Sequence, residues 1–205
     1  MDRSEFSAGL AAKFVGGWAE AGGTTAELNA LAEDGDQLHR LIAVRRGYAE
    51  IKPLDPIIRV DRTISPTYPN WMEEVIHPEL EATGPDNFDV GALDQWLHPK
   101  QEKGMVTGEV IHKYLKQNKM LTSYLGLRDL EEIQKKGIAF FRKFFSSKAV
   151  FGWKSVVRRR FGCLCVPYLF EHGGVVVLDW RWLGNGWGDG DPALRLASPA
   201  NGGTS

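Results

Sequence analysis

Three apolar runs in the last third of the chain constrain its fold more than any other feature. They cover residues 148–158, 163–170 and 174–183, and each is rich in β-branched and aromatic side chains. Turn-forming residues separate them, at Gly162 and at Gly173-Gly174. Short strands joined by glycine-containing turns are typical of an antiparallel meander. We therefore predict a three- or four-stranded antiparallel sheet in this part of the chain.

Alternation within the third run predicts which side of that strand faces the core. The even-numbered residues from Val176 to Trp182 are all apolar, whereas the odd-numbered positions become polar at Asp179 and Arg181. Successive side chains of a strand point to opposite faces of the sheet. We therefore expect the even-numbered face to be fully buried.

The first fifty residues show helical spacing instead. Apolar residues recur at every fourth position from Phe6 to Phe14, and Thr24 with Glu27 has the spacing of a capping box that begins a helix. Glycine pairs interrupt the pattern between the helices. We predict that three short helices form a helical N-terminal unit over residues 1–52.

Prolines punctuate the next segment, residues 53–100. Seven of the ten prolines of the chain lie here, and that density excludes a long helix. Trp71 and Trp96 argue against a disordered linker, because disordered segments lack side chains worth burying. We predict an ordered, irregular, acidic and Pro-rich arm with two short helices, near residues 70–76 and 89–97.

Helical spacing returns between Thr107 and Gly137, and a break near Asn118 divides this stretch into a helical hairpin. The aromatic run that follows, residues 138–145, fits a helix and a buried strand equally well. Together the patterns predict an α+β fold in which the helical hairpin packs on the antiparallel sheet. After the N-terminal unit and the arm, the chain is thus expected to form a basic α+β domain over residues 101–198 and a disordered tail over residues 199–205.

Apolar runs and cysteines both bear on the compartment of the protein. The longest uncharged, mostly apolar run, Phe161 to Phe170, is too short to span a bilayer, and the N-terminus lacks the apolar stretch of a signal peptide. Cys163 and Cys165 are two residues apart on one strand, a spacing that is poor for a stapling disulfide. We expect reduced thiols on one face of that strand, at least one of them buried, in a cytoplasmic protein without a membrane partner.

Basic residues are concentrated in residues 101–160. This stretch holds 14 of the 25 Lys and Arg residues against five acids, a net charge of +9 in a chain whose total is −1. Clustered cations favour a nucleic acid or another polyanion, because binding releases the counterions of a phosphate backbone. The residues predicted to bind nucleic acid are Lys113, Lys116, Arg142, Lys143, Lys154, Arg158, Arg159 and Arg160. We expect at least two of the three consecutive arginines to project into solvent near Lys154.

Internal pairing is the alternative explanation for these cations. Residues 53–100 carry nine acids and three bases, so this segment would neutralise the basic stretch if it folded against it. In that case several of its acids should lie within salt-bridge reach of basic residues in 101–160. The acids expected to do so are Glu73, Glu74, Glu79 and Glu81.

The helical hairpin and the tryptophans support two further hypotheses. A hairpin followed by strands resembles the winged-helix order, in which the second helix enters the major groove. The acids Asp129, Glu131 and Glu132 weaken this hypothesis, because a helix that faces phosphates favours neutral or basic residues. Trp187, in a glycine-rich loop, is the tryptophan expected to be exposed, which would suit a protein partner.

No motif in the chain specifies a reaction. Cys165, His172 and Asp179 supply the residue types of a thiol triad, but no motif surrounds the cysteine. The histidines show no metal-ligand spacing. We predict no catalytic residue, metal site or cofactor. The preferred function is a non-enzymatic binding protein, either nucleic-acid-associated or a phage or mobile-element accessory protein, and the expected partner is a nucleic acid or an acidic protein. An adaptor or inhibitor that binds another protein through the acidic arm or the Trp-rich sheet ranks second, and a hydrolase third.

Three segments of the C-terminal half carry a resemblance. They are residues 128–133, residues 151–154 (Phe-Gly-Trp-Lys) and residues 179–183 (Asp-Trp-Arg-Trp-Leu). Together they resemble a pattern in uncharacterised bacterial proteins from environmental genomes. The resemblance implies a bacterial or phage-like origin and a cytosolic location, and it transfers no active residue or cofactor.

Overall fold

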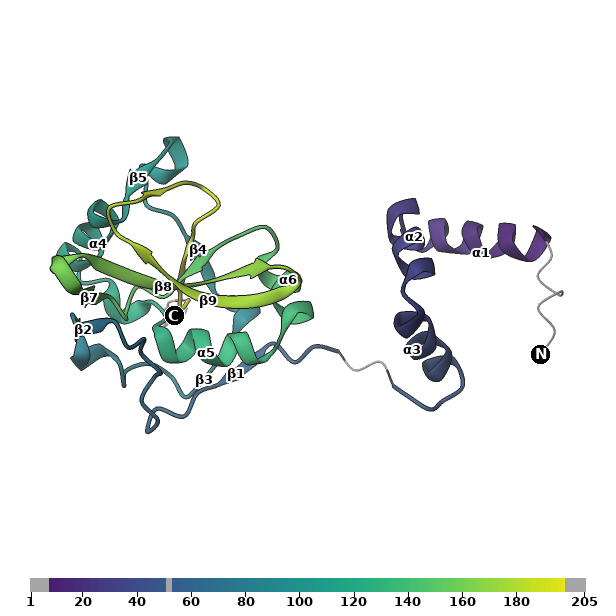
Figure 1. Cartoon of the computed structure of the whole chain (residues 1–205), viewed down its shortest axis with the longest axis horizontal. Helices are drawn as coiled ribbons and strands as arrows, with labels where there is room; N and C mark the ends of the chain where they lie inside the picture. Colours follow the sequence, from purple (N-terminus) through teal and green to yellow (C-terminus); the bar gives the residue numbers. More distant parts are fainter. Residues whose placement is uncertain (1–7, 51–52, 198–205) are drawn as a thin grey trace, which may run out of the picture. The chain divides into compact units, whose positions relative to one another are not determined.

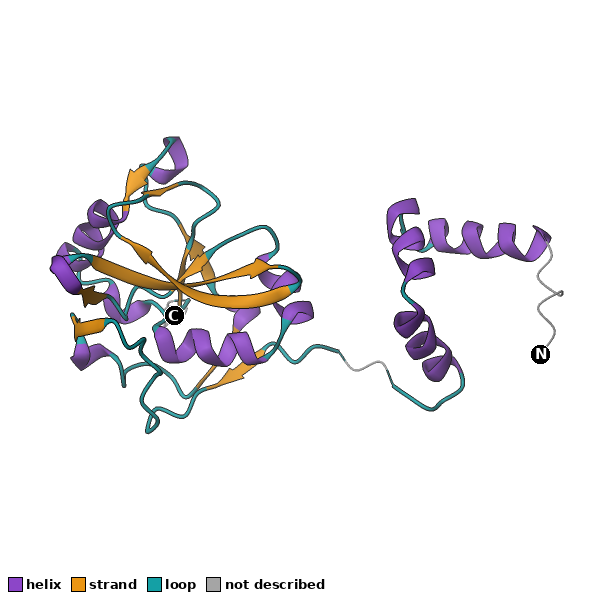
Figure 2. Ribbon diagram, in the orientation of Figure 1, coloured by secondary structure: helices purple, strands orange, loops and turns teal. Residues whose placement is uncertain are grey.

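The computed structural model describes residues 8–50 and 53–197, and the chain forms two compact units (Figure 1). The N-terminal unit spans Met1–Pro53 and the C-terminal unit spans Leu54–Ser205. The tail predicted over residues 199–205 lies outside the described residues. Figure 2 shows the helices and strands together, and they confirm the predicted α+β class.

The N-terminal unit consists of three helices: α1 (Ala8–Glu20), α2 (Thr25–Glu33) and α3 (Gly35–Arg45). The predicted capping box forms, since the Glu27 N–H donates to Thr24 Oγ1 at 3.2 Å and the Thr24 N–H donates to Glu27 Oε2 at 2.8 Å. Among the side chains described in this unit, only that of Leu31 is buried. The three helices therefore form from local signals and enclose little apolar core.

The C-terminal unit is built on a seven-stranded sheet. The strands are β2 (Met72–Val75), β4 (Asp94–Trp96), β6 (Val150–Phe151), β7 (Val157–Arg159), β8 (Leu164–His172), β9 (Val175–Trp182) and β11 (Ala193–Arg195). Their order is β2-β7-β8-β6-β11-β4, and β9 pairs with β8. The β6–β11 pair is parallel, and the other pairs are antiparallel. The sheet is thus larger than the predicted meander, which supplies β6, β7, β8 and β9 but not β2 and β4.

Two outer strands of the sheet come from the predicted arm. β2 pairs with β7, with Val75 opposite Val157, and β4 pairs with β11, with Trp96 opposite Ala193. The helix predicted near residues 70–76 is therefore wrong, and of the one predicted near residues 89–97 only a 3₁₀ turn, Val90–Ala92, forms before β4 begins. Pairing with strands far away in the sequence overrides the local helix signals. Residues 54–100 also belong to the same compact unit as the residues that follow them.

Shorter elements complete the unit. β1 (Ile57–Arg59) pairs with β3 (Asn87–Asp89), and β5 (Val106–Thr107) pairs with β10 (Gly186–Trp187). The 3₁₀ helices are η2 (Pro78–Leu80), η3 (Val90–Ala92), η4 (Gln101–Lys103), η5 (Leu121–Ser123) and η6 (Arg160–Gly162). The long hairpin of β8 and β9 runs through the middle of the unit in Figure 1.

Three longer helices flank the sheet: α4 (Gly108–Gln117), α5 (Leu127–Lys135) and α6 (Ile138–Phe145). α4 and α5 form where the sequence predicts two helices, but they pack in different cores and so do not make the predicted helical hairpin. α6 shows that the ambiguous aromatic stretch is a helix. At the start of α5, the Asp129 carboxylate accepts a hydrogen bond from the Gly126 N–H at 2.8 Å. This bond satisfies one of the N–H groups that a helix N-terminus leaves free.

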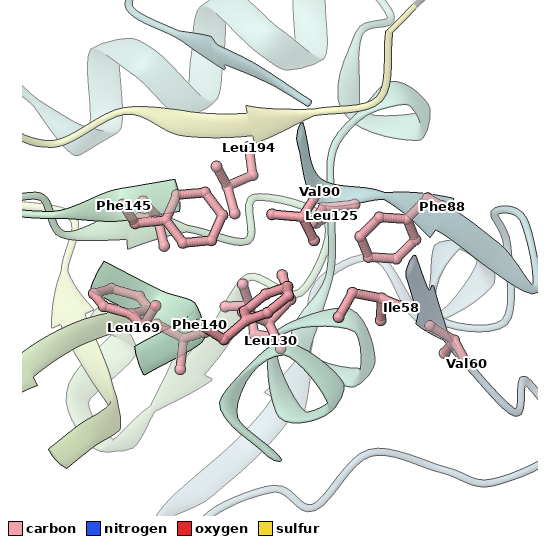
Figure 3. Packing of buried hydrophobic residues seen from close by; sticks show 13 residues of the cluster. Ile58, Val60, Phe88, Val90, Leu125, Leu130, Phe140, Phe145, Leu169 and Leu194 are labelled. Atoms are coloured by element: carbon pink, nitrogen blue, oxygen red, sulfur yellow. The ribbon is translucent and has the colours of Figure 1, made fainter. Parts of the chain in front are cut away.

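Two apolar cores lie on opposite faces of the sheet. One joins α5, α6 and Leu169 of β8, as Figure 3 shows, and the other joins α4 to residues that include Phe151 of β6. Strand alternation explains the division, because Val150 and Phe151 are neighbours that belong to different cores. Tyr168 and Leu169 of β8 divide in the same way.

β9 is less buried than its sequence pattern predicts. Val176 and Leu178 pack against the core of α5 and α6 but stay half-buried, and Trp182 is 47% exposed. β9 pairs with β8 alone, so it is an edge strand. The expectation of a fully buried face is therefore wrong, because alternation gives the direction of a side chain and not the extent to which other elements cover it.

Candidate nucleic-acid interface

A groove at α4 and β7 brings together three of the predicted cations. Lys113 and Lys116 lie one turn apart on α4, and Arg158 comes from β7. The groove has a volume of about 350 Å³. Its other lining residues are Ile76, Glu109, His112, Leu164 and Leu183. We call this feature the basic groove; its lining combines apolar side chains with cations on two different elements.

The positive charge of the basic groove is only partly compensated. The Arg158 Nε donates to Glu74 Oε2 at 2.7 Å, so β2 supplies a carboxylate partner for this cation. Within the described residues, Lys113 and Lys116 form no ion pair, and Glu109 is the only carboxylate in the lining. Both lysines are exposed. The groove therefore keeps an excess of positive charge that faces solvent.

One lining residue of the groove, His112, belongs to a buried histidine pair. The Nε2 atoms of His77 and His112 lie 3.0 Å apart, so one imidazole N–H donates to the other ring. Burial, the neighbouring His77 and the Lys116 charge lower the pKa of His112 to about 4. Burial also lowers the pKa of His77, against the opposing effect of Glu79. Both rings are therefore neutral at pH 7, and the positive charge of the groove comes from its lysines and arginine.

The end of β7 and the turn after it carry two further predicted cations. We call Arg158–Gly162 the arginine turn. Arg159 and Arg160 are exposed, as predicted, and the Arg159 guanidinium carbon lies 5.3 Å from the centre of the Trp71 ring. This distance suits a cation–π contact. Among the described residues neither Arg159 nor Arg160 has a carboxylate partner within ion-pair distance. Arg159 follows Arg158 in β7, so its side chain points to the opposite face of the sheet from the basic groove. Together with Lys113 and Lys116, Arg159 and Arg160 make four cations that form no ion pair among the described residues.

Lys154 does not belong to this surface. Its side chain is buried, with Nζ donating to the Thr83 carbonyl oxygen at 2.9 Å. It lies in a buried ion network in which the Arg62 guanidinium donates to Asp129 Oδ1 at 2.6 Å. Burial lowers the pKa of Lys154, and Asp129 opposes this effect. The prediction that Lys154 is a phosphate contact is wrong, because the segment around Thr83 folds over it.

The same network accounts for one of the four acids expected to pair with the basic stretch. Glu81 accepts a hydrogen bond from Ser155 Oγ at 3.0 Å, and burial raises its pKa while Lys154 lowers it. Glu74 forms the one direct salt bridge of the four, with Arg158. Glu79 lies 3.8 Å from His77 Nδ1 instead. The acids of residues 53–100 therefore neutralise only part of the positive charge of residues 101–160.

Arg142 and Lys143 lie at the opposite end of the long hairpin from α4 and β7 (Figure 1). The Arg142 Nε donates to both carboxylate oxygens of Glu171, at 3.0 and 3.1 Å, and Lys143 Nζ lies 5.2 Å from the centre of the Phe144 ring. Both side chains are exposed, but they do not share a surface with the basic groove. The predicted set of cations therefore divides into three separate places.

Trp187 is fully buried, so its predicted exposure and partner contact are wrong. β10 pairs with β5 and carries the ring into the core on the α4 side of the sheet, where the Arg181 guanidinium lies 4.7 Å from its centre. Gly108 makes this close approach feasible, because a Cβ there would lie 2.5 Å from Cζ3 of the indole. The glycine-rich loop thus closes on the core and does not present its tryptophan to solvent.

The winged-helix hypothesis fails on the placement of α5. Leu127, Arg128, Asp129 and Leu130 are all buried, so the first turns of the supposed recognition helix are covered by protein. A recognition helix needs its N-terminal residues free to reach base edges. α5 therefore serves the core and the buried ion network.

The residue types of a thiol triad are not brought together. Cys165 and His172 lie near opposite ends of β8, about 23 Å apart at the usual rise of a strand. Both cysteines are free, and Cys165 is buried, as predicted. Burial raises the pKa of the Cys165 thiol, which disfavours the reactive thiolate.

Three further findings bear on function. In the described part of the chain, no cluster of three or more His, Cys, Asp or Glu side chains is arranged to hold a metal ion. Within the same residues, no helix combines the length and apolar character needed to cross a membrane. Comparisons of the chain with protein-family models, curated proteins and solved structures found no match. The geometry of the cations is thus the main guide to function.

Proposed function

We propose that this protein is a non-enzymatic nucleic-acid-binding protein whose contact surface consists of the basic groove and the arginine turn. The observation that carries the proposal is the convergence of Lys113 and Lys116 with Arg158 on one groove. These residues come from two elements that are distant in the sequence. Arg159 and Arg160, which directly follow Arg158, add two exposed cations.

The proposal has a simple energetic basis. Each phosphate neutralised by Lys or Arg releases condensed counterions, which gives affinity that does not depend on sequence. Four uncompensated cations are available, from Lys113 and Lys116 on α4 and from Arg159 and Arg160 on the turn. The apolar side chains that line the basic groove, such as Leu164, add a surface suited to a sugar or base. We infer binding with little sequence specificity.

A second candidate is a protein-protein adaptor that binds through β9. This strand pairs with β8 alone, and Val175 and Trp182 are 57% and 47% exposed. An open strand edge with apolar side chains suits the addition of a strand from a partner. Such binding would be insensitive to salt, which separates it from the first proposal.

The test removes the cations in matched pairs. The variant Lys113→Ala/Lys116→Ala loses two charges from the groove, and Arg142→Ala/Lys143→Ala loses two charges from the far end of the hairpin. Fluorescence anisotropy with a labelled 20-nucleotide mixed-sequence oligonucleotide, repeated at several salt concentrations, gives the affinity and its salt slope. We expect the groove variant to lower the slope by roughly 1.5 units and the far-end control to leave it unchanged.

Two outcomes contradict the proposal. One is a parent protein that binds no oligonucleotide at low salt. The other is an equal loss of affinity in both double variants, because a uniform effect would reflect net charge and not a site. Retention of a protein partner at high salt, abolished by Trp182→Lys, would favour the adaptor in its place.

A further inference from the structure

Phe161 occupies an unusual position in the arginine turn. Its side chain is 100% exposed, more than any other large hydrophobic side chain among the described residues. Its backbone has φ 68° and ψ 19°, in the left-handed region. Lys119 and Ser147, the other non-glycine residues with positive φ in the described chain, are polar. A bulky aromatic residue at such a φ is an outlier.

Folding does not account for this residue. A left-handed φ favours glycine or asparagine, and a fully exposed ring buries no apolar surface that would offset the strain. Gly162, the next residue, already supplies a positive φ of 77° for the turn. Strain that the fold does not require is a reason to ask what the exposed group binds.

The surroundings of Phe161 restrict the kind of ligand. Arg159 and Arg160 precede it, so the ring stands beside two exposed cations without carboxylate partners among the described residues. A protein hot spot has an apolar surround that excludes water, and a helix bound at a membrane surface presents an apolar face of several residues. The arginine turn has neither, since Phe161 is fully exposed and no other apolar side chain of the described residues covers its ring. An exposed aromatic ring beside cations instead suits a ligand that presents a base next to phosphates.

We propose that Phe161 stacks on an unpaired base while the neighbouring arginines contact phosphates, so that the ligand of the arginine turn is single-stranded nucleic acid. This inference rests on the proposed function and narrows its ligand class. A duplex hides the faces of its bases within the stack, whereas a single strand offers each face to an aromatic side chain. Stacking tolerates any base, which agrees with the low sequence specificity inferred above.

The experiment compares three substitutions of Phe161 on a labelled 20-nucleotide single strand and on its duplex. Phe161→Ala should weaken binding of the single strand by about 5- to 100-fold. The salt slope should stay the same, because no cation is lost. Phe161→Trp should restore the affinity, and the added indole should lose fluorescence on binding. Binding of the duplex should be weaker in the parent and unaffected by Phe161→Ala.

Phe161→Leu separates stacking from simple apolar contact. Leucine keeps apolar surface but has no aromatic face, so we expect it to resemble the alanine variant. Since the side chain is fully exposed, all three variants should fold, and unchanged thermal unfolding provides the check. A leucine variant that binds the single strand as tightly as the parent would overturn the stacking role.

The remaining outcomes distinguish the two proposals. Equal binding of single strand and duplex, unchanged in Phe161→Ala, overturns this inference and leaves the proposed function standing. Absence of binding to either oligonucleotide overturns both. Binding to anionic phosphatidylserine vesicles that depends on Phe161, without oligonucleotide binding, also overturns both and assigns the turn to a membrane surface.

Discussion

The two units of the chain differ in how far they bury their apolar side chains. In the N-terminal unit, Leu31 is the only buried side chain described, while Phe14 and Tyr48 are 56% and 81% exposed. In the C-terminal unit, two cores fill opposite faces of a sheet. Both units have helices capped by a side chain, such as Asp34 at α3, which accepts from the Gln37 N–H, and Asp129 at α5, which accepts from the Gly126 N–H. Regular secondary structure alone thus says little about stability.

The comparison separates two sources of helix formation. In the N-terminal unit the signals are local, because the capping box of Thr24 and Glu27 acts within one turn. In the C-terminal unit, helix α5 contributes Leu130 and Ile133 to a core with β8. Isolated helices of this length are marginal in water, whereas tertiary packing provides most helical stability in proteins. We therefore expect equivalent changes to have unequal effects in the two units.

The largest contrast should come from truncating one phenylalanine in each unit. Phe140 of α6 is buried in the core, and Phe14 of α1 is mostly exposed. Phe140→Ala should lower the free energy of unfolding of the C-terminal unit by about 3–5 kcal/mol, because it leaves a cavity. Phe14→Ala should change it by less than about 0.5 kcal/mol. Urea denaturation of the full chain, followed by tryptophan fluorescence, measures both; equal effects would contradict the difference in burial.

A smaller contrast should appear as a dependence on pH. The pKa of His112 is about 4 in the folded protein, because of burial first and then of His77 and Lys116. The unfolded chain has an ordinary histidine pKa, about 6.5, so below that pH the unfolded state binds a proton that the folded state does not. Stability is therefore lost as pH falls from about 6.5 toward about 4. At pH 5 the loss from this group should be roughly 2 kcal/mol.

Two variants test this linkage. In the parent, His112 contributes to the loss of unfolding free energy between pH 7.5 and pH 5. His112→Gln should remove most of that contribution. His39 is exposed on α3 and provides the matched control in the other unit. His39→Gln should leave the pH dependence as it is in the parent. If His112→Gln loses as much unfolding free energy at pH 5 as the parent does, the buried histidine pair is not the cause of that loss.

The sequence predicted the features that short-range patterns determine. Capping residues and apolar spacing located α2, α4 and α5, and turn residues located the hairpin of β8 and β9. β2 and β4 were missed because their strand character depends on partners that are distant in the chain. No local signal at Met72–Val75 distinguishes an edge strand from a short helix.

The candidate site was predictable to a similar extent. Charge clustering identified Lys113, Lys116 and Arg158, and the fold brings these three to one groove. It also identified Lys154, which is buried, because composition does not record what folds over a side chain. His77 was missed, since its contact with His112 joins residues without any spacing signal.

The smallest expected effect is that of removing the N-terminal unit altogether. Apart from Leu31, every buried hydrophobic side chain among the described residues belongs to the C-terminal unit, which begins at Leu54. A fragment of residues 54–205 should therefore keep its fold, with a melting temperature within about 4 °C of the C-terminal transition in the full chain. The fragment of residues 1–53 should show only marginal helicity by circular dichroism, because short helices without a core are unstable in water.

Calorimetry of the full chain and of the fragment of residues 54–205 measures the change in melting temperature directly. A drop of about 10 °C or more in the larger fragment would contradict the expectation that the C-terminal unit folds on its own buried cores.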